Sequence, residues 1–198
     1  MESAKIEAKK LTEEYENEGK LPDEKPFYEE NGIRLFTDEK NSAGLNKIIG
    51  DEKSLENYLQ AHFSRIKKDD YFALLAYIEM NAENESILQE IRHSVLQNKG
   101  AATCLGFGPR FLHSTGQGYK GGANNGVFLQ ITSDDQIDLD VPAQKYTFGI
   151  VKAAQARGDF QVLLDRNRRA LRVHLGKDVK AGLEILRNSI ESASDYEN

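Results

Sequence analysis

Residues 106–126, which read GFGPRFLHSTGQGYKGGANNG, concentrate side chains that can transfer protons and bind polar ligands. The segment holds seven of the 16 glycines, and glycine lets a backbone approach a ligand closely. Histidine titrates near neutral pH, which makes His113 the candidate for acid–base chemistry. The accompanying side chains that suit hydroxyl groups or a phosphate are Arg110, Ser114, Thr115, Gln117 and Lys120. This combination predicts a sugar-phosphate site, against the alternative of a surface loop with an incidental histidine.

The glycine spacing does not match the common nucleotide-binding patterns. Neither GxGxxG followed by an acidic residue nor GxxxxGK[ST] is present, so a dinucleotide fold and a P-loop are both unsupported. The other histidines are expected to be structural or exposed: His62 on the apolar side of a helix, His93 on a polar side and His174 within a strand. The residues 106–126 therefore remain the candidate site.

No metal site is expected from the sequence. The histidines and carboxylates show no HExxH-like spacing, and a single cysteine excludes a cysteine-rich site or an internal disulfide framework. An acidic stretch before Pro142 lacks the glycine turn and terminal glutamate of an EF-hand loop, so it is expected to be solvated. Its carboxylates are Asp134, Asp135, Asp138 and Asp140.

Composition and charge exclude several classes of protein. The net charge of −6 argues against a nucleic-acid partner, since phosphate neutralisation needs a basic face. Arg166–Arg172, which reads RNRRALR, is a local exception that could face a phosphate or simply be solvated. No apolar run reaches the roughly 20 residues of a membrane span, and the charged N-terminus does not resemble a signal peptide. We therefore expect a cytoplasmic protein without a membrane partner.

Alternating strand and helix patterns surround residues 106–126. Buried-strand patterns lie at residues 71–78, 101–107, 127–132 and 171–175, with a further short strand at 32–37. Helical periodicity is found at residues 2–18, 54–67, 83–97, 146–164 (with a break near Gly158) and 179–192. Four strands interleaved with helices predict a parallel sheet covered on both faces. Residues 106–126 directly follow one strand, at the edge where such sheets bind ligands.

The first 50 residues differ from the remainder of the chain. A charged helix at Glu2–Glu18 is followed by Gly19 and by a proline-containing stretch at Leu21–Asn31 that is typical of a surface linker. We therefore expect a charged N-terminal helix and linker arm at residues 1–50, and an α/β domain at residues 51–198.

Three blocks of the sequence resemble a known family. GPRFLHSTGQGYKGGANNGVFLQIT, VPAQKYTFGIVKAAQARGDFQVL and RRALRVHLG are similar to the C-terminal part of the glucose-6-phosphate isomerase half of bifunctional transaldolase/glucose-6-phosphate isomerase proteins. The resemblance runs over most of Asp70–Leu186, and a weaker one links ESAKIEAKKLTEEYENEGKLP to the residues that follow the FDQPxVE motif. It implies a three-layer α/β/α parallel sheet of the sugar-isomerase, flavodoxin-like kind with a helical N-terminal arm.

The resemblance also implies a chemistry. The family interconverts glucose 6-phosphate and fructose 6-phosphate through an enediol without a metal or redox cofactor. Its HSTxQ motif maps the catalytic histidine onto His113 and a polar contact onto Gln117, and Lys5 takes the place of the catalytic lysine. The family's ESxGK-like glutamate motif, its Ser/Thr-rich phosphate loop and the transaldolase barrel have no counterpart here.

We therefore expect a segment of a fusion or split isomerase that an upstream isomerase domain or partner chain completes. Two alternatives remain open. One is a non-catalytic sugar-phosphate binding or regulatory module, and the other is an interaction domain that docks through its charged N-terminal helix.

Overall fold

The computed structural model describes residues 2–195, and its side chains from residue 3 to residue 191. Its centre is a sheet with the strand order β1-β2-β6-β5-β3-β4. The strands are β1 (Tyr28–Glu30), β2 (Ile33–Phe36), β3 (Tyr71–Tyr77), β4 (Ala102–Phe107), β5 (Gly126–Thr132) and β6 (Arg169–His174). The last four are parallel, whereas β1 and β2 form an antiparallel hairpin that joins β6. When the four parallel strands are numbered 1 to 4 along the chain, their order across the sheet is 2-1-3-4. This is the arrangement of flavodoxin-like sheets, and it confirms the expected sheet type.

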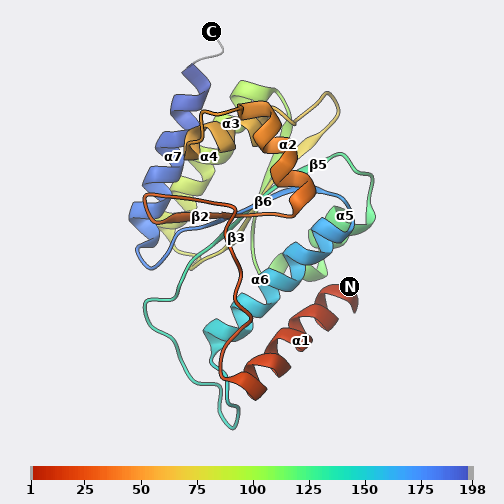
Figure 1. The fold of residues 1–198 in the computed structure, drawn as a ribbon, viewed down its shortest axis with the longest axis vertical. Coiled ribbons are helices and arrows are strands. Elements are labelled where there is room, and N and C mark those ends of the chain that lie inside the picture. The colour runs from red at the N-terminus through yellow and green to blue at the C-terminus, as the bar shows by residue number, and fades with distance from the viewer. Residues whose placement is uncertain (1, 196–198) are drawn as a thin grey trace.

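Helices cover both faces of this sheet (Figure 1). One layer consists of α2 (Glu39–Ile49), α3 (Leu55–Phe63), α4 (Ala82–Lys99) and α7 (Val179–Asp195). The opposite layer consists of α1 (Glu2–Glu18), α5 (Thr115–Gly121) and α6 (Phe148–Asp165). The three-layer α/β/α class expected from the sequence is confirmed. Within residues 2–195, no helix is both long enough and apolar enough to cross a membrane.

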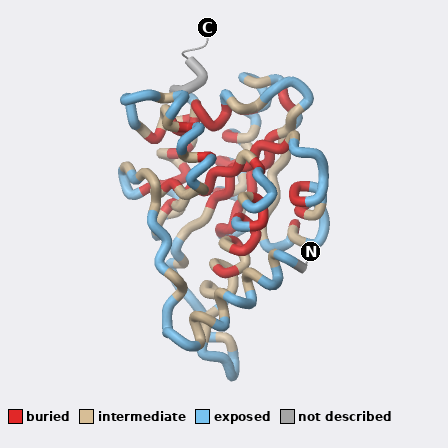
Figure 2. The backbone as a smooth tube through the Cα atoms, turned by 45° about the vertical axis from the view of Figure 1, so that its right-hand side comes forward, coloured by how far each residue is buried: buried red, intermediate tan, exposed pale blue. Residues whose placement is uncertain are grey.

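The core lies on both sides of β3, as its almost continuously apolar sequence predicts. Phe72 and Leu74 pack into the cluster beneath α3, α4 and α7, while Leu75 and Tyr77 pack into a second cluster beneath α6. Figure 2 shows the buried residues concentrated along the strands, with exposed residues on the outer helices and loops.

The division expected at residue 50 does not follow the folding units. Leu35 of β2 and Leu45 of α2 are fully buried in the main core, and β2 pairs with β6 along Arg34–Phe36. The helix α2 was not expected from the sequence, because its few apolar residues are interrupted by Gly44. Its first turn is capped by Asp38, whose side chain accepts a hydrogen bond from the Asn41 backbone. Residues 27–49 therefore belong to the α/β domain.

The helix α6 continues through Gly158, where the sequence predicts a break. A Cβ on Gly158 would lie 2.9 Å from the Ala8 nitrogen and 3.1 Å from the Ala4 oxygen. The glycine is needed because the backbone of α1 crosses α6 at this point, and the N-terminal helix is thereby packed onto the domain.

Candidate functional site

The segment expected to be a glycine-rich loop is largely helical. After β4 the chain forms a short 3₁₀ helix, η1 (Arg110–His113), and then α5. We call residues 110–122 the HSTGQ segment. It lies at the carboxyl end of β4, which is the edge of the sheet predicted for it.

Several glycines around this segment allow close packing within the protein rather than contact with a ligand. A Cβ on Gly108 would lie 2.5 Å from the Tyr77 ring, and one on Gly116 would lie 2.8 Å from the Phe111 carbonyl oxygen. Phe111 is buried, and its ring meets that of Tyr77 edge to face at 5.6 Å. Close packing on one aromatic anchor therefore fixes the course of the HSTGQ segment.

Lys120 lies inside the protein, where it pairs with Asp159 of α6. The two side chains are 9% and 2% exposed. Tyr77 donates a hydrogen bond to the same carboxylate at 3.3 Å. Burial raises the pKa of Asp159, and Lys120 acts in the opposite direction. The side chain of Lys120 thus braces α5 against α6, where the sequence predicted a contact with substrate.

Two further predicted contact residues are engaged within the segment or next to it. The Gln117 Nε2 donates to the Leu112 carbonyl oxygen at 2.6 Å, which closes the turn between η1 and α5. The exposed Arg110 lies with its Nη1 3.3 Å from the Met80 sulfur, in the connection that follows β3. Both side chains help to hold the HSTGQ segment in place.

His113, Ser114 and Thr115 are exposed, as is Arg110. The first three lie between two buried anchors, Phe111 and Gly116. These exposed residues lie on a turn that is fixed on its inner side, where the Ser114 hydroxyl donates to the Phe111 carbonyl oxygen at 3.4 Å.

Lys5 lies on the exposed side of α1. Its neighbour Ala4 packs against Gly158, and the next residue of α6, Asp159, pairs with Lys120 of the HSTGQ segment. The first turns of α1 and the HSTGQ segment are therefore both held on the middle of α6. Figure 1 shows the start of α1 on the same side of the molecule as α5.

A cavity that was not predicted from the sequence lies on the other side of Tyr77 from Phe111 of the HSTGQ segment. It has a volume of about 430 Å³ and opens at the carboxyl ends of β3, β5 and β6. Residues 21–24, the loop after β5 and the first half of α6 complete its walls. We call it the carboxyl-edge cavity. The β3–β5 boundary is the point where the strand order reverses, so the cavity occupies the usual ligand position of such sheets.

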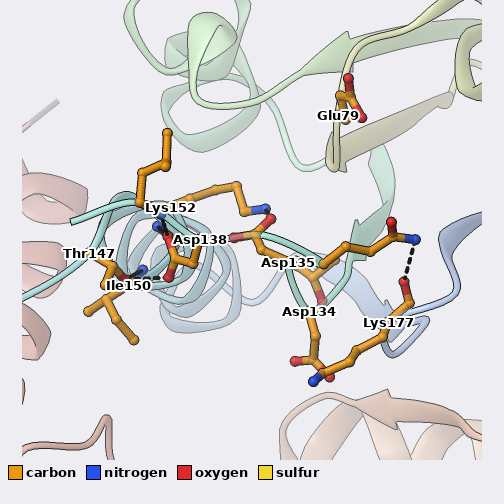
Figure 3. Close-up of polar contacts among 12 residues, drawn as sticks. Glu79, Asp134, Asp135, Asp138, Thr147, Ile150, Lys152 and Lys177 are labelled. Carbon is orange, nitrogen blue, oxygen red and sulfur yellow. Dashed lines mark hydrogen bonds and ion pairs between the residues drawn. The ribbon is translucent and has the colours of Figure 1, made fainter. Parts of the chain in front are cut away.

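The acidic stretch is largely exposed, as expected, and Asp134, Asp135 and Asp138 also line one wall of this cavity. Asp135 pairs with Lys152 of α6 (Figure 3). Asp138 accepts hydrogen bonds from the Thr147 hydroxyl and, at 2.8 Å, from the Gly149 backbone nitrogen. Burial raises the pKa of Asp138, but these hydrogen bonds outweigh it and hold that pKa below its ordinary value. In the part of the chain that the structure describes, no three His, Cys, Asp or Glu side chains group as metal ligands.

His174 also lines the cavity, although the sequence indicated only a structural or exposed histidine. Its Nδ1 lies 3.0 Å from the Thr132 hydroxyl, and its Nε2 lies 3.3 Å from an Asp134 carboxylate oxygen. Burial lowers the pKa of His174 more than Asp134 raises it, which favours the neutral imidazole. The sequence did hold a signal for this position, because His174 is the last residue of β6 and the carboxyl ends of parallel strands form the ligand-binding edge of the sheet.

Arg172 reaches the cavity from β6 and is almost fully buried. Its Nη2 donates to the Glu24 carboxylate at 2.7 Å, and its guanidinium lies over the Phe36 ring at 4.3 Å. The arginines of Arg166–Arg172 therefore do not form a single surface patch. Arg168 donates to the Lys120 and Gly122 carbonyl oxygens, and Arg169 pairs with Asp70.

Neither a protein-family description nor a curated protein matches this sequence. Among solved structures, the chain is similar to a hypothetical protein, TT0462, from Thermus thermophilus, with a TM-score of 0.61 and 14% sequence identity. The similarity covers 78% of this chain and 42% of that protein, so this chain corresponds to less than half of its length. At this identity the similarity establishes a shared α/β fold.

Proposed function

We propose that this chain forms part of a glucose-6-phosphate isomerase that interconverts glucose 6-phosphate and fructose 6-phosphate in the cytoplasm. In this proposal His113 assists opening of the sugar ring by donating and accepting a proton. Lys5 assists the same step from α1. Other polypeptide, either an upstream isomerase domain or a partner chain, supplies the glutamate that moves the proton between C1 and C2.

One observation carries the proposal. His113 is exposed on a turn whose inner side is fixed by Phe111, Gly116 and the Lys120–Asp159 pair. A general acid–base group must reach its substrate from a defined position, and a histidine on a braced turn at the carboxyl edge of the sheet meets that requirement. The neighbouring Ser114 and Thr115 are exposed, and the Ser114 hydroxyl, which donates to the Phe111 carbonyl oxygen at 3.4 Å, can still accept a hydrogen bond from a polyhydroxylated ligand.

A second candidate is a non-catalytic module that binds sugar phosphates. The engagement of Gln117 and Lys120 in the fold favours it, because two of the side chains expected to contact substrate instead bond to protein groups. In that case the HSTGQ segment would bind a hexose phosphate without accelerating its isomerisation.

A coupled assay of fructose 6-phosphate conversion tests the proposal. The assay should be run on this chain alone, and on this chain together with any isomerase polypeptide that is encoded upstream of it. In the completed enzyme, His113→Ala should lower kcat by about 10²-fold or more, the usual contribution of a general acid–base group. His93→Ala, at an exposed histidine of α4 on the opposite helical layer, is the matched control and should leave kcat unchanged.

Full activity of the His113→Ala enzyme would refute the catalytic role of the HSTGQ segment. Binding of hexose 6-phosphate without any turnover in the completed protein would favour the binding module instead.

A further inference from the structure

Two arginines of the carboxyl-edge cavity share a single carboxylate oxygen. The Arg172 Nη2 and the Arg157 Nε both lie 2.7 Å from the Glu24 Oε2. The Arg172 side chain is 4% exposed, whereas that of Glu24 is 34% exposed. A buried guanidinium requires an anion beside it, because its desolvation is otherwise uncompensated. Glu24 supplies that anion from the solvent side of the cavity.

Glu24 belongs to a segment that could move without breaking regular structure. Residues 19–26, which we call the strap, connect α1 to β1 and contain neither helix nor strand. The strap is also held by the Arg157 Nη1, which donates to the Pro22 carbonyl oxygen at 2.7 Å. Arg157 thus holds the strap at both Pro22 and Glu24, so an anion that competes for Arg157 would act on both contacts.

The single charge of the Glu24 carboxylate balances only one of the two guanidiniums that it contacts. Burial lowers the pKa of Arg172; Glu24 raises it, and the nearby guanidiniums of Arg157 and Arg34 lower it again. Two guanidiniums, those of Arg157 and Arg172, therefore share the Glu24 carboxylate, whereas the Arg34 guanidinium lies 3.8 Å from Asp134. A phosphate group carries up to two negative charges and several acceptor oxygens, so each arginine could bind its own oxygen.

The other carboxylates of the cavity have partners of their own, and Asp23 pairs with Lys20 at 2.8 Å. Asp135 is paired with Lys152, and Asp138 is held by the first turn of α6. Asp134 lies 3.3 Å from His174 and 3.8 Å from Arg34. Its carboxylate and the Thr132 hydroxyl are hydrogen-bonding groups that suit the uncharged part of a small polar ligand.

We propose that the carboxyl-edge cavity binds a phosphate group, either free or as the monoester of a small molecule, through Arg157 and Arg172. In the structure described above, Glu24 occupies the place of that phosphate. Binding displaces Glu24 and releases the strap. This inference does not depend on the chemistry of the HSTGQ segment.

Titrations with inorganic phosphate and with glycerol 3-phosphate test the binding step. The readout is the side-chain NMR signals of Arg157 and Arg172 at constant ionic strength. Glu24→Gln keeps an acceptor oxygen but removes the competing charge, so it should bind either probe more tightly by about tenfold, equivalent to about 1.4 kcal/mol. Glu18→Gln, at an exposed glutamate of α1, makes the same chemical change away from the arginines and should bind like the unmodified protein.

The two probes also distinguish the source of the phosphate. Tighter binding of glycerol 3-phosphate assigns the site to monoesters, whereas equal or weaker binding assigns it to free phosphate. The absence of a saturable shift at Arg157 and Arg172 in both the unmodified protein and Glu24→Gln would overturn the proposal, as would equal affinities of these two proteins.

Limited trypsin cleavage of the unmodified protein tests the release of the strap without any variant. Phosphate should accelerate cleavage after Lys20, within the strap, relative to cleavage after the exposed Lys68 between α3 and β3. An unchanged or slower cleavage after Lys20, at a phosphate concentration that shifts the arginine signals, would show that Glu24 is not displaced.

Discussion

The HSTGQ segment and the carboxyl-edge cavity lie at the same edge of one sheet but are built in opposite ways. The HSTGQ segment is a single stretch of chain whose polar residues alternate with its own anchors, Phe111 and Gly116. The cavity draws its charged groups from five separate parts of the chain, which are the strap, β2, the loop after β5, α6 and β6. Sequence patterns reveal the first kind of site, whereas only the fold assembles the second.

The two regions also differ in how their lysines are paired. Lys120 and Asp159 are almost fully buried, whereas Lys152 and Asp135 are 25% and 29% exposed. Because removal of one partner leaves an uncompensated buried charge, Lys120→Met should destabilise the protein by about 3–5 kcal/mol. Lys152→Met should lower the free energy of unfolding by about 1 kcal/mol or less, since water screens the remaining Asp135 carboxylate. Urea unfolding of the two variants checks the difference, and equal losses would contradict the structural role given to Lys120.

The packing of α1 on α6 gives the next largest effect. A Cβ on Gly158 would press on backbone atoms of Ala4 and Ala8, which cannot yield as a side chain can. Gly158→Ala should therefore cost about 1–3 kcal/mol, as overpacking usually does. Gly118→Ala in α5 is the control, because its Cβ would meet nothing within 4 Å. Thermal unfolding compares the two, and a Gly158→Ala protein as stable as Gly118→Ala would show that α1 is not held at this crossing.

The N-terminus of α6 forms part of the cavity wall and depends on a cap. The Thr147 side chain accepts a hydrogen bond from the Ile150 nitrogen at 3.2 Å. Thr147→Ala should cost about 1 kcal/mol and speed amide exchange in the first turn of α6. Ser54→Ala, at the cap of α3 on the other helical layer, should cost a similar amount without changing exchange in α6. Unchanged exchange in the Thr147→Ala protein would mean that the cap does not hold the cavity wall.

The smallest expected effect concerns the titration of His174. Burial lowers its pKa below the ordinary 6.5, and Asp134 partly counteracts this. Asp134→Asn should therefore lower the pKa of His174 further, as followed by NMR of the imidazole. The unfolded chain binds this proton more readily than the folded protein, so the contribution of His174 to stability falls as the pH drops below 6.5. A rise in its pKa on Asp134→Asn would contradict the geometry of the cavity.

The sequence predicts elements whose signals are local. The apolar run at Tyr71–Tyr77 identifies β3, and helical spacing that ends at Gly100, a left-handed cap, identifies α4. It misses α2 because Gly44 interrupts a weak apolar stripe, and it misplaces a break at Gly158 because only the fold shows α1 beside that glycine.

The candidate site is predicted unevenly for a related reason. The composition of residues 106–126 indicates where His113 lies, but it does not distinguish side chains that face solvent from those that hold the turn. Lys120 has the residue type of a phosphate ligand and is bound to Asp159 instead. Arg172 and Glu24 are 148 residues apart, so no local pattern could have paired them.

Chemical-shift mapping with glucose 6-phosphate tests the central claim most directly, since it compares the two regions in one experiment. If the HSTGQ segment binds hexose 6-phosphates, the amide signals of Gly116 and Gly118 should shift in a saturable way, and His113→Ala should weaken that response. Shifts confined to Gly149 and Asp134 in the carboxyl-edge cavity, with none in the HSTGQ segment, would contradict the proposed function.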